Sequence, residues 1–148
     1  MRSLWDDEAR ADIVARVGNL GPESERQWGK MDCPTMVGHL ANGLRMVLGE
    51  RDLGPPRGPY RFAPMRYLLV HVVPWPRGKA KAPQEPQQKS VEEWTAERDD
   101  LLALIDRAAQ TPADEFGATH FLFGKMTHRD WGVLAYRHLD HHLTQFGA

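Results

Sequence analysis

The sequence predicts an all-α fold, and two observations carry this prediction. Four stretches place apolar residues at the spacing of an amphipathic helix, and helix-starting and helix-stopping residues mark their ends. No stretch combines the alternating pattern of a half-buried strand with a strand partner nearby. At 148 residues the chain fits one domain, so we expect a single helical-bundle domain over residues 1–148.

Four long helices and one short helix are predicted. They cover residues 3–20, 34–49, 65–73, 90–110 and 127–146. Three starts show an S/T-x-x-D/E pattern, which satisfies free backbone N–H groups of the first turn: Ser3 with Asp6, Ser90 with Glu93, and Thr127 with Asp130. The second helix opens at Pro34, whose missing N–H the first turn tolerates. Stop signals follow at Gly21-Pro22, Gly49 and Thr111-Pro112.

Long Pro-rich connections flank the short helix. Residues 50–64 contain six glycines and prolines, so we predict a surface loop there. The run MRYLLVHVV at 65–73 suits a strand or a short buried helix, and the lack of a strand partner favours the helix. Residues 74–89 form the second Pro-rich connection, and THFLFGKM at 119–126 is interpreted as a short apolar connection.

Charge and composition argue against several classes of partner. Nineteen Lys and Arg residues against twenty Asp and Glu leave a net charge of −1 without a basic run, so nucleic acid is not expected. No stretch approaches the roughly 18 apolar residues of a membrane span, so we expect no membrane partner. Acidic residues lie where a signal peptide would be apolar, which favours a cytoplasmic location. The one cysteine, Cys33, is predicted to be a packing residue.

The last helix carries three of the seven histidines, within YRHLDHHLTQFGA. At about 100° per residue, the core-facing arc contains Trp131, Leu134, Ala135, Leu139 and Phe146. His138 and His142 flank the middle of this arc, so both imidazoles should point inward from adjacent turns. Asp140 lies on the opposite face beside Arg137 and Thr144, which makes it a poor metal ligand. His141 lies at the edge of the arc and can face either way.

Two inward imidazoles need partners, because a buried polar group without a hydrogen bond costs about 1–3 kcal/mol. A divalent cation is one solution, although a hydrogen-bonded pair is more frequent for this spacing alone. His39, one turn from Gly43 at the border of the second apolar stripe, is either a third ligand or a polar neighbour of the core. Gln145 either hydrogen-bonds a ligating histidine or is satisfied by the backbone.

Two further sets of residues leave alternatives open. Arg45 and Asn42, near His39, either orient a ligand or are solvated. Four tryptophans either line a pocket or belong to the core, and the core is the more frequent role for large aromatics at helical spacing: Trp28, Trp75, Trp94 and Trp131.

Most of the chain resembles a known family. The segments WGKM…MVGHLANGLRMVLGE, WTAERDDLLALI and HFLFGKMTHRDWGVLAYRHLDHHLTQFGA resemble the DinB/YfiT-like superfamily of metal-dependent proteins, in a branch with an HLDHHLRQFG-type ending. The resemblance implies a four-helix bundle that holds a divalent ion, often zinc or nickel, with one histidine from the second helix and two from the last. By position these are His39, His138 and His142. The branch's HPxFGPLT-type segment is replaced by HFLFGKMT, which leaves the role of His120 open.

Three imidazoles leave a coordination position open for water or substrate, as in catalytic zinc sites. A bound ion lowers the pKa of water towards about 7 or deprotonates a thiol, and the resemblance implies thiol-dependent S-transferases and hydrolases. We therefore expect either activity on a small molecule, with a low-molecular-weight thiol as partner. A homodimer is compatible with the resemblance. The alternative is a non-catalytic helical-bundle module for binding or dimerisation.

Overall fold

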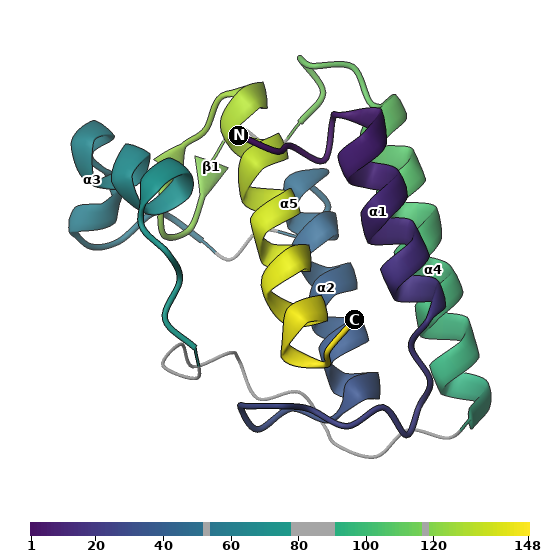
Figure 1. The fold of residues 1–148 in the computed structure, drawn as a ribbon. Coiled ribbons are helices and arrows are strands. Elements are labelled where there is room, and N and C mark those ends of the chain that lie inside the picture. The colour runs from purple at the N-terminus through teal and green to yellow at the C-terminus, as the bar shows by residue number, and fades with distance from the viewer. Residues whose placement is uncertain (52–53, 78–90, 117–118) are drawn as a thin grey trace.

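The computed structural model describes residues 1–51, 54–77, 91–116 and 119–148, and these are mostly helical (Figure 1). The helices are α1 (Asp7–Gly18), α2 (Cys33–Val47), α3 (Ala63–Tyr67), α4 (Val91–Gln110) and α5 (His128–Gln145). A 3-10 turn, η1 (Pro59–Arg61), precedes α3, and a π-helical turn, η2 (Leu68–Val72), continues it. Two short strands, β1 (Thr119–His120) and β2 (Gly124–Lys125), pair antiparallel before α5. The prediction of a helical class is confirmed.

The four long helices surround one apolar core. α1 packs against α4 and α5, and α2 packs against the same two helices, so that the four run side by side in Figure 1. Each contributes the stripe that its sequence pattern predicts, and the most deeply buried members include Ile13, Leu40, Leu101 and Leu139. Trp131, in the first turn of α5, belongs to this core and is 1% exposed.

The start of α1 lies later than predicted. The Ser3 backbone N–H donates to Asp6 Oδ2 at 2.9 Å, so the pattern closes a turn before the helix rather than its first turn. Trp5 therefore precedes α1, and its indole N–H donates to the His128 carbonyl of α5. Leu4, in the same turn, is fully buried.

The other helix ends follow the predicted signals where the structure describes them. At the start of α2, the Asp32 side chain accepts from the Thr35 N–H, and Pro34 lies in the first turn. Thr127 and Asp130 form a complete capping box at the start of α5. α4 ends just before Thr111-Pro112, whereas Ser90 lies outside the described residues.

Three predictions about the connections are wrong. Residues 50–64 are not one loop, because η1 forms within them and α3 begins at Ala63, where Pro64 occupies the first turn. The helix at 65–73 is not buried as a whole, since only Val70 and His71 are withdrawn from solvent. Residues 119–126 contain a hairpin rather than a plain connection, and its Gly124 adopts a positive φ of 71°.

Within the described ranges, none of the helices is both long and apolar enough to cross a membrane.

Candidate metal centre

One histidine from α2 and two from α5 meet at the interface between these helices. The candidate ligand atoms of His39, His138 and His142 all lie within 4.8 Å of one another. His39 Nε2 is 2.9 Å from His138 Nε2, and the His39 ring is 4.9 Å from the His142 ring between centroids. All three side chains are half-buried. The structure thus brings together the three residues that the helical phase and the family resemblance selected.

Gly43 provides the space in which His138 lies. A Cβ atom at this position would be 2.9 Å from His138 Nδ1 and 3.0 Å from its Cε1, closer than side chains normally approach. Because Gly43 follows His39 by one turn on α2, the absence of a side chain there lets the α5 imidazole reach His39. The space that Gly43 leaves on α2 is therefore taken by a histidine of α5.

A chain of hydrogen bonds fixes the protonation pattern of His142. The Gln145 amide nitrogen donates to the Trp28 carbonyl at 2.6 Å, which turns the amide oxygen towards His142. That oxygen lies 2.9 Å from His142 Nδ1, so Nδ1 must carry the hydrogen and donate it. The lone pair of neutral His142 is then on Nε2. In metal sites, a ligating histidine usually donates a hydrogen bond from its second ring nitrogen in this way.

The surroundings disfavour a charge on two of the three histidines, His138 and His142. Burial lowers the pKa of His138 well below its usual value, and the neighbouring His142 and His39 lower it further. Burial, followed by the proximity of His39, lowers the pKa of His142 to about 4 against a hydrogen bond to Gln145 that raises it. Neutral imidazole is the form that binds a metal.

This donor set fits a divalent cation. The His39–His138 contact joins two Nε2 atoms and needs one N–H and one lone pair, so a cation bound to both nitrogens would require one ring to carry its hydrogen on Nδ1 instead. Three neutral nitrogen ligands suit zinc, nickel, iron and copper alike.

The polar neighbours of the cluster have structural partners. Asp140 accepts from Arg16 of α1 at 2.7 Å, and it is not among the residues close enough to share one ion with His39, His138 and His142. Arg45 donates to Asp100 of α4 at 2.6 Å and to Asn42 at 3.3 Å. Arg45 therefore links α2 to α4 through an ion pair, a role that neither sequence-based alternative had named.

Two other candidate residues have roles in packing. The His120 side chain is 5% exposed, and its Nδ1 accepts from the N–H groups of Leu122 and Phe123, so it stabilises the hairpin turn. Burial lowers its pKa to about 4. Cys33 is buried, and burial raises the pKa of its thiol to about 12, which makes it a poor nucleophile and confirms the packing role.

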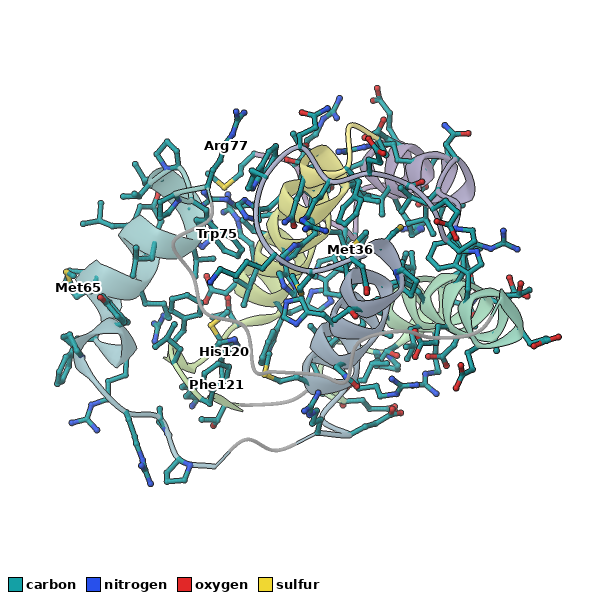
Figure 2. All side chains as sticks on the ribbon, turned by 90° about the horizontal axis from the view of Figure 1, so that it is seen from below. Met36, Met65, Trp75, Arg77, His120 and Phe121 are labelled. Atoms are coloured by element: carbon teal, nitrogen blue, oxygen red, sulfur yellow. The ribbon has the colours of Figure 1, made fainter. Side chains whose placement is uncertain are left out.

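A cavity of about 240 Å³ lies beside the histidine cluster. His141, which the sequence placed at the edge of the stripe, lines this cavity, and so does Trp75, whose ring lies 6.3 Å from the His138 ring between centroids. Figure 2 shows Trp75 and Arg77 on the segment that follows η2, on the side facing α5. The lining residues are Trp28, Pro74, Trp75, Arg77, Arg137, Asp140, His141 and Thr144.

The tryptophans divide between two roles. Trp94 and Trp131 are core residues, 3% and 1% exposed, whereas Trp28 and Trp75 line the cavity. Arg77 stacks on the Trp28 ring and Arg137 on the Trp75 ring. The sequence offered a pocket as the less frequent of two roles for these tryptophans, and it could not select Trp28 and Trp75 for that role because they lie in irregular segments without helical periodicity.

We compared the chain with known protein families, curated proteins and solved structures. No family model, no curated protein and no solved structure matches this chain.

Proposed function

We propose that this chain is a DinB-like four-helix-bundle protein that binds one divalent metal ion through His39, His138 and His142. It would act as a thiol-dependent S-transferase or as a hydrolase on a small molecule. The observation that carries the proposal is the convergence of three histidine side chains from two helices, with candidate ligand atoms within 4.8 Å of one another. The resemblance noted in the sequence supplies the choice of reactions.

The surroundings of the cluster support a reactive site rather than a closed structural one. Three protein ligands leave room for a further ligand, and a bound ion would acidify a thiol or water held there. The adjacent cavity, about 240 Å³, is smaller than the roughly 300–1,000 Å³ of typical ligand pockets, so it would hold only part of a small molecule, and Trp28 and Trp75 offer apolar contact area there. Arg77 and His141 offer hydrogen-bond donors to an anionic or polar group of the substrate.

The first test measures metal content. Protein purified without a histidine tag and analysed for metals should contain about one divalent ion per chain. His138→Ala and His142→Ala should lose it, because each removes one of three ligands. His141→Ala is the matched control on the same helix, and it should retain the ion because His141 lines the cavity. A parent protein with substoichiometric metal that none of these substitutions changes would refute the metal site.

The second test measures turnover. The metal-loaded protein should transfer a low-molecular-weight thiol to an electrophile or hydrolyse an ester, and removal of the ion with a chelator should abolish the reaction. Glutathione, bacillithiol and mycothiol are the thiols to compare. If fully loaded protein turns over none of these substrates, the catalytic part of the proposal is wrong and a non-catalytic binding module is the better interpretation.

A further inference from the structure

Large apolar side chains are exposed on one face of the molecule. Of the ten such residues in the described ranges, eight lie within residues 60–73 or at Phe121. Phe62, Tyr67 and Val72 are 58%, 60% and 56% exposed. Figure 2 shows Met65 at the outer edge of this region. We call this surface the apolar face, and its main members are Phe62, Met65, Tyr67, Leu68, Val72 and Phe121.

The apolar face is continuous across two segments that are distant in sequence. The Arg57 N–H donates to the Phe121 carbonyl at 3.1 Å, which joins the tip of the hairpin to the segment before η1. A Cβ atom at Gly124 would be 3.2 Å from Arg61 Cβ, so β2 lies directly against η1. The hairpin therefore extends the surface that η1, α3 and η2 begin.

Positive charge accompanies the apolar face. Residues 54–77 and 119–129 contain six of the nineteen Lys and Arg residues and none of the twenty Asp and Glu residues. Five of these six are exposed, and within the described ranges none forms an ion pair with a carboxylate. The six are Arg57, Arg61, Arg66, Arg77, Lys125 and Arg129. Arg77 stacks on Trp28 at the cavity, and the other five accompany the apolar face of a chain whose net charge is −1.

The helical segment α3–η2, which carries most of the apolar face, is attached to α5 of the bundle by hydrogen bonds. His71 donates to Asp130 of α5 at 2.7 Å, and these side chains are only 6% and 14% exposed. Arg137 of α5 donates to the carbonyls of Leu69 and Val70 in the last turn of this segment. The inner side is therefore bound by polar contacts with α5, while the outer side presents apolar groups to solvent.

We propose that the apolar face docks the protein onto an anionic lipid bilayer. Aromatic and aliphatic side chains between arginines are the composition of elements that lie in the headgroup region, where the rings enter the acyl boundary and the cations meet lipid phosphates. The sequence-based expectation of no membrane partner considered only spanning segments. This inference does not depend on the metal centre.

Charge argues against two other occupants. A second copy that docked symmetrically would bring the same five cations against themselves, and like charges disfavour such a contact. Nucleic acid would use the cations but not the exposed Met65, Leu68 and Val72, because phosphate recognition does not require aliphatic groups.

The test is co-sedimentation of the full chain with vesicles at low salt. Vesicles of equimolar phosphatidylserine and phosphatidylcholine should bind the protein, and vesicles of phosphatidylcholine alone should not. Phe62→Ser combined with Leu68→Ser should abolish binding, whereas Val14→Ser, which removes an exposed apolar residue of α1, should leave it unchanged. Circular dichroism should show that every variant is folded.

Charge is tested with matched pairs of substitutions. Arg57→Gln with Arg61→Gln should weaken vesicle binding roughly thirtyfold, the effect of two surface cations. Arg98→Gln with Arg107→Gln removes the same charge from α4 and should have little effect. Failure to bind either vesicle would overturn the proposal. So would a lipid-independent dimer that Leu68→Ser dissociates, because that result would assign the face to a second copy.

Discussion

Gly43 lies one helical turn after His39 on α2, and the imidazole of His138 occupies the space that a side chain at Gly43 would fill. This glycine therefore decides whether a histidine of α5 can approach a histidine of α2. Gln145 has a comparable role one turn along α5, because its amide orients the His142 ring. Neither residue is itself among the three candidate ligands, yet both determine the geometry of the cluster.

Gly43→Ala should weaken metal binding while α2 stays helical. Alanine is favoured over glycine in a helix by about 1 kcal/mol, so the backbone should tolerate the change. The added Cβ would displace His138, whose Nδ1 would otherwise be 2.9 Å away. We expect roughly tenfold lower affinity, measured by competition with a chromophoric chelator.

Gly18→Ala is the control for this prediction, because a Cβ at Gly18 of α1 meets no atom within 4 Å. It should leave metal affinity unchanged. Equal affinities in the parent and in Gly43→Ala would show that His138 is not held where the structure places it.

The sequence predicted the histidine cluster better than it predicted the surrounding residues. His138 and His142 follow from helical phase alone, because they lie four residues apart on an amphipathic helix. His39 lay only at the edge of a stripe, and the family resemblance was needed to select it. The partners of Arg45 and Asp140 belong to α4 and α1, so periodicity within one helix could not identify them.

At the scale of elements, the hairpin depends on a buried histidine. His120 accepts two backbone N–H groups through Nδ1 in the turn between β1 and β2, and a proton on Nδ1 would break both bonds. Its folded pKa is lowered to about 4, below the usual value of 6.5. The unfolded chain therefore binds the proton more readily, so stability contributed by neutral His120 is present above pH 6.5 and is lost as the pH falls towards 4.

His120→Asn should flatten this pH dependence. An Asn oxygen can accept the same two N–H groups but does not titrate near neutral pH. Denaturant unfolding of metal-free protein should show a loss of stability between pH 6.5 and 4 that reaches about 3 kcal/mol at most for this one residue. If the free energy of unfolding fell equally with pH in the variant and the parent, the loss of stability would belong to groups other than His120.

Short elements were predicted less well than long ones. The interpretation of residues 50–64 as a loop rested on the number of prolines, although Pro64 favours a first helical turn just as Pro34 does in α2. The apolar run at 65–73 indicated burial, but its inner side meets α5 through His71 and Leu69 while its outer side stays exposed. Composition alone cannot separate a core element from an exposed docking surface.

Over the whole molecule, the cluster joins parts of the chain that are far apart in sequence. His39 and His138 are separated by 99 positions and belong to α2 and α5, which pack against each other across the core. A ligand held by both helices therefore binds the folded chain and has no comparable site in the unfolded one. Metal binding should consequently be coupled to global stability.

A thermal unfolding experiment measures this coupling. At a free metal concentration about 100-fold above the dissociation constant, zinc or nickel should add about 2.7 kcal/mol of stability, which raises the midpoint by about 5–10 °C for a domain of this size. His138→Ala combined with His142→Ala should unfold at a midpoint that metal does not change, because two of three ligands are missing. His128→Ala is a suitable control, since His128 stacks on Trp5 outside the cluster. Its midpoint should rise with metal as in the parent. An equal rise in the double variant would place the bound ion elsewhere on the chain and disconnect it from the interface between α2 and α5.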